Sequence, residues 1–373
     1  MMRMTKYIAL LLMICMIPLH ADFAKLGTSG AQFLKISVGR GTAMGEAFVA
    51  ISDDASATFW NPSGLAAVTN REISFYHNEW IADIRHDYLT AVFPLGGFGT
   101  MGVSITALTM GEMEITAVDD PNTSIREDTG TGTFFNAADY AVGFSFGRMF
   151  TDRLAAGITL KAVQEQIWHM SATGVAMDFG IHYNTGVSGL RLAAAMNNFG
   201  TDIAFSGRDL EYADDPFPNS PIFYELVPAA YRATPFPLPL MFRFGVAFDP
   251  VSNENNRLTV ALDLNHPNDN YETINLGLEY GYLNTLFLRV GYKMYTNMEY
   301  MRAMTGGEPV LDTVENVMTY PDWGDDFVQL LNNLSAGVGF HLKTGVTQFK
   351  IDYAYMNKGI LSHTHRIGLS IVF

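Results

Sequence analysis

The last seven residues of the chain alternate strictly between large apolar and other side chains. The large ones are Ile367, Leu369, Ile371 and Phe373, and a glycine, a serine and a valine stand between them. Successive side chains of a strand point to opposite faces, so this period predicts a strand with one apolar face. The period recurs in many segments upstream. Because only helices and closed barrels satisfy their backbone in hydrocarbon, the sequence predicts an all-β, transmembrane antiparallel β-barrel of the bacterial outer membrane.

Residues 1–21 have the composition of an export signal peptide. Arg3 and Lys6 precede an apolar core at 8–19, which is too short for a spanning helix, and residues 19–21, with the small Ala21, form the expected cleavage site. The only cysteine, Cys15, offers a lipoprotein alternative. We favour the signal peptide because an isoleucine, not a small residue, precedes this cysteine. A chain processed after residue 21 would contain no disulfide and no thiolate metal site.

The composition favours a membrane wall over a soluble β-protein. The chain is 48% apolar and 13% aromatic but only 16% charged, which is too little for a solvated outer coat. After residue 21 no apolar run reaches the length of a spanning helix, so the apolar residues are dispersed in alternation. The net charge of −15 disfavours nucleic acid as a partner. Acidic loops that face water or divalent cations, or solubility alone, account for the acidity.

Fourteen alternating segments follow residue 71, separated by turn residues. Most have the length of about 9–11 residues that a tilted strand needs to cross a bilayer, and bacterial barrels have even strand numbers. A further segment, 112–118, is interpreted as a strand extension outside the membrane. The predicted strands are 72–80, 85–95, 99–109, 136–148, 154–167, 173–184, 189–199, 240–249, 257–265, 272–281, 285–295, 333–342, 347–356 and 364–373.

The links between these segments differ in length in a regular way. The long links, 110–135, 200–239 and 296–332, all join an odd-numbered strand to the next even one. The links after even-numbered strands are short or moderate. Transmembrane barrels have short periplasmic turns and longer outer loops, so this asymmetry supports the barrel and places residue 71 on the periplasmic side.

The two faces of the predicted strands differ in chemistry. One face carries leucine, valine and phenylalanine, with aromatic residues near the strand ends that fit interfacial girdles or ordinary strand enrichment. The other face combines small residues with charges of both signs, as expected for a wet or plugged lumen. The predicted lumen charges are Arg191, Arg243, Asp263, Glu279, Arg289, Asp352 and Arg366.

Residues 22–70 do not alternate and are rich in glycine and alanine, which permits close backbone packing in a confined space. An Asn-Pro pair followed by glycine is turn chemistry. We expect three parts: a signal peptide at 1–21, an N-terminal hatch or plug inside the lumen at 22–70, and the barrel at 71–373. The residues assigned to the hatch motif are Asp53, Asp54, Trp60, Asn61, Pro62, Gly64 and Leu65.

From Ser29 to Leu65 the chain resembles the PorV/PorQ family, relatives of the FadL-type fourteen-stranded barrels. The matching stretches read Gly-Ala-Gln-Phe-Leu, Ala-Met-Gly-Glu-Ala-Phe, Asp-Asp-Ala-Ser-Ala and Trp-Asn-Pro-Ser-Gly-Leu. A second matching patch covers 263–270, and the pattern extends to the end of the chain. FadL-type proteins share a looser Asn-Pro-x-Gly-Leu sequence, so residues 61–65 alone do not separate the two groups.

The resemblance implies a barrel with an N-terminal hatch and two alternative functions. PorV-type members work with type IX secretion, which implies secreted cargo proteins or secretion-system components as partners at the cell surface. FadL-type relatives pass hydrophobic molecules through a lateral opening, which implies a channel for compounds such as long-chain fatty acids, with a hydrophobic ligand or detergent in the barrel. We expect the first function, with the second as alternative and a purely structural barrel as a weaker third.

The sequence shows no catalytic constellation, so no enzymatic activity, cofactor or metal is expected. His363 and His365 share a strand face but lack partners at metal-binding spacing. The acidic stretches at 119–122 and 322–326 match no known calcium loop, so solvated acids are the favoured interpretation. The patch 265–270 is interpreted as an Asx/Pro turn.

The link 200–239 is the candidate contact surface for a partner or ligand. It contains seven of the fifteen prolines, which lower the entropy lost on docking, and aromatic residues that bury much area. A lid folded over the barrel mouth is the equal alternative. Its candidate contact residues are Phe217, Phe223, Tyr224, Tyr231 and Phe236.

Overall fold

The computed structural model describes most of the chain from residue 28 onward. The predicted signal peptide, with Cys15, and both acidic stretches at 119–122 and 322–326 lie outside the described residues. Within the described part, no helix has the length and apolar character needed to cross a membrane. The described ranges are 28–116, 130–187, 189–215, 226–296, 310–312, 317–319, 333–358 and 363–373.

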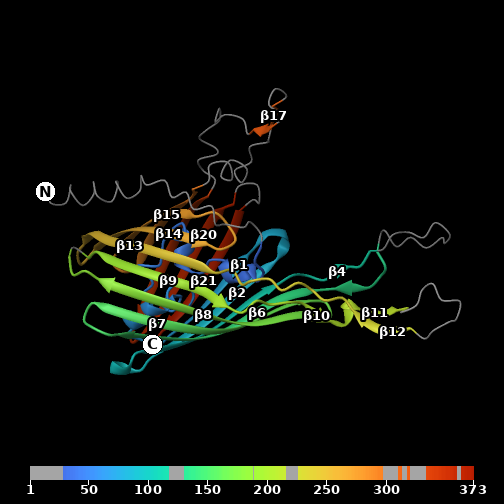
Figure 1. Cartoon of the computed structure of the whole chain (residues 1–373). Coiled ribbons are helices and arrows are strands. Elements are labelled where there is room, and N and C mark those ends of the chain that lie inside the picture. The colour runs from blue at the N-terminus through green and yellow to red at the C-terminus, as the bar shows by residue number, and fades with distance from the viewer. Residues whose placement is uncertain are drawn as a thin grey trace.

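Fourteen antiparallel strands form a closed barrel (Figure 1). Each pairs with the next barrel strand along the chain, and the first strand pairs with the last. The predicted fold class and strand number are confirmed, with ends that differ by a few residues. The strands are β1 (Glu72–Glu79), β2 (Arg85–Pro94), β3 (Thr100–Thr109), β6 (Ala137–Met149), β7 (Leu154–Ile167), β8 (Met170–Asn184), β9 (Arg191–Gly200), β13 (Met241–Ser252), β14 (Asn256–Pro267), β15 (Thr273–Tyr282), β16 (Leu286–Tyr295), β19 (Leu334–Thr344), β20 (Thr347–Asn357) and β21 (His363–Val372).

Short elements lie in the links between these strands. The pairs β4–β5 and β11–β12 extend beyond the barrel at the end where the long links lie (Figure 1). Of the predicted extension 112–118, the described part ends at residue 116, and within it Met113–Glu114 forms the strand β4. These elements are η3 (Ile81–Asp83), η4 (Gly96–Phe98), β4 (Met113–Glu114), β5 (Phe134–Phe135), β10 (Ser206–Gly207), η5 (Arg208–Leu210), β11 (Glu211–Asp214), β12 (Val227–Ala230), β17 (Val310–Asp312) and β18 (Val317–Thr319).

The barrel is apolar on its outer face. On β13, Phe242 and Phe244 are 47% and 46% exposed, whereas Arg243 between them is 8% exposed. Leu276 and Leu278 repeat the outward placement on β15. A soluble protein would place these side chains in its core, so the contact that they need is hydrocarbon. The wall is therefore a transmembrane wall.

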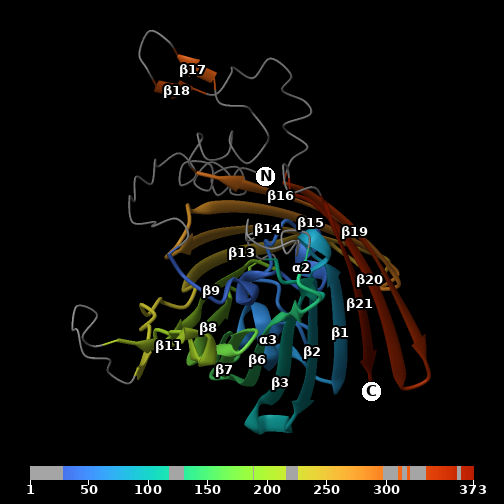
Figure 2. The ribbon, with the colours of Figure 1, turned by 90° about the vertical axis from the view of Figure 1, so that its right-hand side faces the viewer.

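The N-terminal segment, residues 28–70, lies within the curve of the barrel strands (Figure 2). Its helices are short because glycine and proline interrupt them, and its large side chains Met44, Phe48 and Trp60 are almost fully buried. The main buried cluster of the molecule joins this segment to inward alanines of the wall. The four helices are η1 (Gln32–Lys35), α2 (Arg40–Ala43), α3 (Ala57–Trp60) and η2 (Pro62–Ala67).

The Asn-Pro turn of this segment packs on a row of wall glycines in β6, β7 and β8. A Cβ atom on Gly147 would lie 2.5 Å from the carbonyl oxygen of Pro62, and one on Gly157 would lie 2.3 Å from the Pro62 carbonyl carbon. A Cβ on Gly180 would lie 1.9 Å from Oδ1 of Asn61. Only glycine allows the two backbones to approach this closely.

A second close contact holds the segment against β15, β16 and β19. The backbone N–H of Gly45 donates to Oγ of Ser335 at 2.8 Å, and that hydroxyl donates to the carbonyl of Ala43 at 3.2 Å. A Cβ on Gly291 would lie 1.9 Å from the nitrogen of Gly45. The N-terminal segment is thus fitted to the wall on two sides of the lumen.

Candidate functional site

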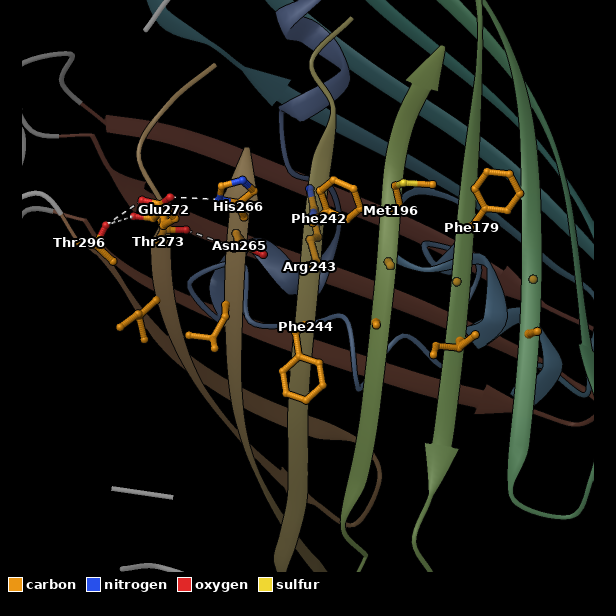
Figure 3. Close-up of a pocket in the computed structure, with 18 residues that line it drawn as sticks. Phe179, Met196, Phe242, Arg243, Phe244, Asn265, His266, Glu272, Thr273 and Thr296 are labelled. Carbon is orange, nitrogen blue, oxygen red and sulfur yellow. Dashed lines mark hydrogen bonds and ion pairs between the residues drawn. The ribbon is translucent and has the colours of Figure 1, made fainter. Parts of the chain in front are cut away.

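A groove of about 680 Å³ crosses the outer face of the wall from β7 to β15 (Figure 3). Its volume lies within the range of about 300–1,000 Å³ that small-molecule sites occupy. The lining is mostly apolar, with polar groups gathered at the end near the loop between β14 and β15. Its outward side chains come from Ala156, Phe179, Ile181, Ala194, Met196, Phe242, Phe244, Leu264, His266, Glu272, Ile274 and Thr296.

The floor of the groove is formed by β9. Ala194 and Met196 point outward yet are only half-exposed. The reason is that Met196 lies in register with Phe179 on one neighbouring strand and with Phe242 on the other. These two rings stand on both sides of β9 and are 37% and 47% exposed (Figure 3). Ala194 lies in the same way in register with Ile181 and Phe244, so a small side chain between larger ones creates the depression.

The wall is thin at this floor. Three alanines follow one another at 193–195, so neither face of β9 carries a large side chain there. Ala193 and Ala195 point inward and belong to the same buried cluster as Val49, Phe59 and Trp60 of the N-terminal segment. Only a strand backbone and methyl groups therefore separate the apolar groove from the apolar part of the lumen.

A β-bulge interrupts β9 directly after this floor. Asn197 and Asn198 together oppose Asp178 of β8, and Asn198 has a positive φ of 62°. The backbone N–H of Asn198 donates to the Asp178 carboxylate at 2.8 Å, and Lys161 donates to Oδ1 of Asn198 at 2.8 Å. The ladder between β9 and β13 ends at the pair of Asn197 and Met241. Bulges locally disrupt a ladder, so this is a weak seam of the wall.

Arg243 lies behind the groove with its side chain turned into the lumen. Its guanidinium carbon is 5.0 Å from the ring centroid of Trp60 and 5.8 Å from that of Phe59. Nε and Nη1 are buried without a hydrogen-bond partner among the described residues. On the adjacent strand Asp263 accepts hydrogen bonds from the N–H groups of Phe48 and Val49 at 2.7 and 2.9 Å.

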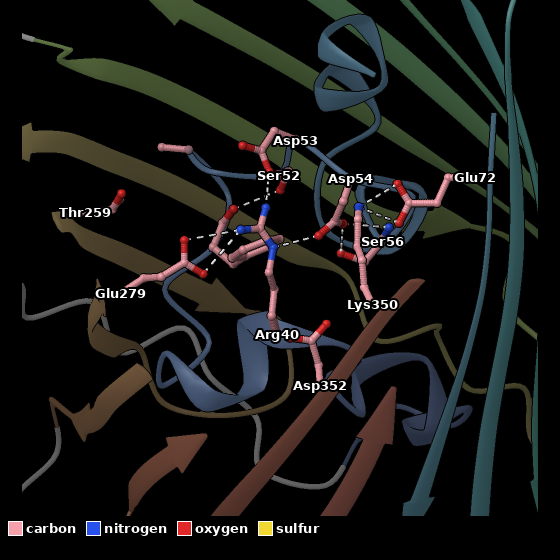
Figure 4. Close-up of polar contacts among 12 residues, drawn as sticks. Arg40, Ser52, Asp53, Asp54, Ser56, Glu72, Thr259, Glu279, Lys350 and Asp352 are labelled. Atoms are coloured by element: carbon pink, nitrogen blue, oxygen red, sulfur yellow. Dashed lines mark hydrogen bonds and ion pairs between the residues drawn. The ribbon is translucent and has the colours of Figure 1, made fainter. Parts of the chain in front are cut away.

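A charged network faces a polar cavity of about 250 Å³ at the short-turn end of the barrel (Figure 4). Arg40 is its centre, because its guanidinium contacts three carboxylates from two parts of the chain. It pairs with Asp53, with Asp54 at 2.6 Å and with Glu279 of β15 at 3.3 Å. Burial raises the pKa of Asp54, but the charges of Arg40 and Lys350 outweigh burial and hold that pKa below its usual value.

The network continues along the wall away from the N-terminal segment. Arg289 donates to Glu279 at 2.7 Å and to Asp352 at 2.5 Å. Lys350 pairs with Glu72 at 3.0 Å (Figure 4). Each of these buried charges has an opposite partner, as burial requires.

Asp269, in the loop between β14 and β15, clamps the start of the N-terminal segment. Its carboxylate accepts from Lys35 at 2.7 Å, from Gln32 at 2.6 Å and from Ser29. Burial raises the pKa of Asp269, and these hydrogen bonds lower it further than burial raises it. Near the second contact with the wall, Lys293 similarly pairs with Glu46 at 2.8 Å and holds the Glu46 pKa below its usual value against burial.

The residues predicted as the hatch motif all lie inside the barrel. Trp60 donates from Nε1 to the carbonyl of Val38 at 3.1 Å. Asn61 accepts from the N–H of Ser63 at 3.1 Å and so caps η2, which begins at Pro62. The remaining members are the ion-paired Asp53 and Asp54, the fully buried Leu65, and Gly64, whose Cβ would lie 1.9 Å from the carbonyl oxygen of Ser52.

The predicted lumen charges all point inward but form separate groups. Glu279, Arg289 and Asp352 are brought together in the network around Arg40. Arg191 pairs instead with Asp249 at 2.7 Å. Arg243 and Asp263 lie behind the groove, and Arg366 donates to the hydroxyls of Ser37 and Thr42.

The predicted contact loop divides into an arm and a cover. Tyr231, after β12, is 68% exposed and stacks on Tyr212 of β11 at 4.7 Å between ring centroids. Phe236 exchanges backbone hydrogen bonds with Ile203 at 2.9 Å and packs against Gly30, so this end covers the N-terminal segment. The other predicted contact residues, Phe217, Phe223 and Tyr224, lie outside the described residues.

Within the described ranges, no three histidine, cysteine, aspartate or glutamate side chains are grouped so that they could hold a metal ion. His363 and His365 lie at the start of β21 and contact the ring of Tyr355.

The groove, Arg40 and Asp269 are parts of a site that no motif in the sequence predicts. The run of three alanines was a usable signal, because a strand that is small on both faces leaves a thin wall. Arg40 stands between two glycines in an otherwise apolar stretch, which is also unusual. Asp269 belongs to the patch 265–270, which the sequence predicts to be a turn. Within that turn its buried carboxylate binds the start of the N-terminal segment.

The chain matches the model of an uncharacterised protein family, UPF0164, over residues 23–200. No curated protein matches it. The resemblance to the PorV/PorQ family stays a prediction.

Several solved structures are similar over most of their length. The toluene transporter TbuX of Ralstonia pickettii is 12% identical with a TM-score of 0.48, covering 94% of this chain and 98% of that chain. The toluene transporter TodX of Pseudomonas putida is 10% identical with a TM-score of 0.48 and the same coverage. The translocator domain of the autotransporter NalP from Neisseria meningitidis is 9% identical with a TM-score of 0.37, covering 90% and 99%.

Proposed function

We propose that this chain is an outer-membrane barrel through whose side wall small hydrophobic molecules pass between the membrane and the lumen. The observation that carries the proposal is the apolar groove over the alanine floor of β9, with an apolar cluster directly behind it. A hydrophobic molecule that lies in the groove meets apolar groups on both sides of the wall. It would therefore cross without entering water, which is the costly alternative for apolar surface.

The N-terminal segment acts as the hatch in this proposal. Its fit to the wall glycines and its ion pairs fill the lumen beside the groove, so it blocks free diffusion along the axis. The bulge at Asn197 and Asn198 interrupts the ladder between β8 and β9, and so supplies a seam at which these two strands can separate. Movement at that seam, with the hatch kept in place, opens a lateral path.

The experiment measures uptake by two tryptophan variants of the barrel. One variant fills the groove, and the other carries the same substitution on the outer face far from the groove. Ala194→Trp places a large side chain on the floor of the groove, and Ala336→Trp places the same side chain on the outer face of β19. Cells without another such channel are supplied with radiolabelled toluene. We expect the native chain and Ala336→Trp to raise uptake equally and Ala194→Trp to reduce it to the level of cells without the barrel. Equal uptake by both variants would refute the lateral route.

A second function, binding of exported proteins in a type IX-like secretion system, is favoured by the arm at β11 and β12. The arm extends beyond the barrel and exposes stacked Tyr212 and Tyr231, a rigid aromatic surface of the kind that protein interfaces use (Figure 1). Deletion of 211–231 removes the arm with both tyrosines and leaves the cover at Phe236. Loss of co-purifying secreted proteins from a folded barrel would support this function, and an unchanged set of proteins would refute it.

A further inference from the structure

The polar end of the groove carries chemistry that the proposed function does not use. His266 on β14, Glu272 directly before β15 and Thr296 directly after β16 gather there (Figure 3). Nδ1 of His266 lies 3.1 Å from Oε1 of Glu272, and Oγ1 of Thr296 donates to Oε2 of Glu272 at 3.3 Å. We name these three residues the cap.

The cap lies at the outer rim of the wall, and the apolar part of the groove descends from it into the membrane. His266 is one residue from the end of β14, next to the loop on the long-link side. It lies in register with Phe242, which lies in register with Met196, followed by Phe179. Because barrel strands are tilted, a hydrogen-bonded row of this kind runs obliquely through the membrane. The groove thus fits a molecule with an apolar tail and a polar head at the rim.

The cap has hydrogen-bonding groups and a carboxylate but no cation aimed at the groove. Among the described lining residues, Arg243 is the only arginine or lysine, and its guanidinium lies in the lumen over Trp60. An anionic head would approach the Glu272 carboxylate without a compensating charge. A hydroxyl head can donate to a free lone pair of that carboxylate, whereas an ionised carboxylate head has no hydrogen to donate.

We infer that the groove selects uncharged amphiphiles with a hydroxyl head, such as long-chain alcohols, over carboxylates of equal length, and that Glu272 determines this choice. The inference rests on the proposed function, because it names the molecules that would use the lateral route. Because a hydrogen bond to a charged group is stronger than one between neutral groups, we expect a preference of at least about tenfold.

The test uses two probes with the same tail, 12-bromo-1-dodecanol and 12-bromododecanoate, at a pH of about 9 where the free acid is ionised. The chain carries Cys15→Ser and one new cysteine with a small fluorophore, and it is placed in lipid nanodiscs. Ala156→Cys reports from the groove, and Ala336→Cys reports from the remote outer face of β19. Bromine quenches a nearby fluorophore, and the ratio of the two reporters removes the contribution of probe dissolved in lipid.

We expect the alcohol to quench the groove reporter at a concentration at least about tenfold lower than the carboxylate does. Glu272→Gln should bring the two probes to within about threefold of each other, because the negative charge of the cap is removed. Glu79→Gln, an exposed glutamate at the outer end of β1, is the matched control and should leave the preference unchanged.

The outcomes separate the inference from the proposed function. Equal quenching of the groove reporter by both probes in the chain with a native cap would overturn the inference and leave the lateral route standing. A preference that persists in Glu272→Gln would overturn the role of Glu272. If neither probe quenches the groove reporter more than the remote one, the groove is not loaded, and both the proposed function and the inference fall. The two probes are compared first in the chain with an unchanged cap. Misfolding of Glu272→Gln would therefore leave the measured preference between alcohol and carboxylate unaffected.

Discussion

The two sides of the lumen hold the N-terminal segment with different chemistry. Beside β8, β9 and β13 the segment presents Val49, Phe59 and Trp60 to inward alanines, and its Asn-Pro turn rests on glycines. Beside β15, β16 and β20 it presents Arg40 to a chain of buried charges and a polar cavity. A hydrophobic molecule is compatible only with the first side. The groove lies on the outer face of that same side. At this place the wall is therefore apolar on both its inner and its outer surface, as the crossing of a hydrophobic molecule requires.

The largest expected effect breaks the glycine contact on the apolar side. Gly180→Val places a side chain where the buried side chains of Asn61 and Pro62 already lie. We expect a loss of about 3 kcal/mol in the free energy of unfolding, since overpacking a close buried contact is costly. Urea unfolding in detergent micelles, followed by tryptophan fluorescence, measures it. Gly97→Val, in a turn where a Cβ meets nothing within 4 Å, is the control, and an equal loss there would remove the support for this contact.

A smaller effect is expected on the charged side. Arg40→Met leaves Asp53, Asp54 and Glu279 without their shared partner. Breaking a fully buried pair costs about 3–5 kcal/mol, but this network faces a polar cavity, so we expect about 2 kcal/mol. Loading of the groove reporter at position 156 should not change, because the groove lies on the other side. A loss of groove loading would show that the two sides do not act separately.

The smallest effect is a dependence of stability on pH. The folded-state pKa values of Asp54 and Asp269 are held below their usual range, so the stabilisation is complete above the unfolded value of about 3.9. It is lost as the pH falls through the lowered folded values. The contribution of these two carboxylates to the melting temperature should therefore stay level from a pH of about 8 to 5 and be lost below about 4. Asp269→Asn should make the fall in melting temperature below that pH shallower, and an unchanged slope would contradict the assignment.

Most of the barrel could be predicted because a membrane imposes a period of two on every strand. The alternation around Arg243 and the distribution of long links were sufficient to predict fourteen strands and the face of each side chain. The N-terminal segment has no such period. Its position in the lumen follows from contacts such as that of Asn61 with Gly180, which are visible only when the chain is folded.

The groove and the network could not be predicted because their members are distant in the sequence. Arg40 meets Asp53 and Asp54 thirteen and fourteen residues away, but Glu279 is 239 residues away. Met196 lies at the floor of the groove because the strand register places the rings of Phe179 and Phe242 on either side of it. Strand register depends on the turns and on the bulge at β9, and a small error would pair Met196 with other residues.

The lateral route is tested most directly by locating an apolar molecule in crystals of the barrel. Crystals grown with 1-bromododecane give an anomalous signal from bromine, which marks its position without reference to density for the tail. We predict a bromine peak on the outer wall beside Ala194 and Met196, between Phe179 and Phe242. Bromine found only within the lumen or spread evenly around the outer belt would contradict entry through this wall.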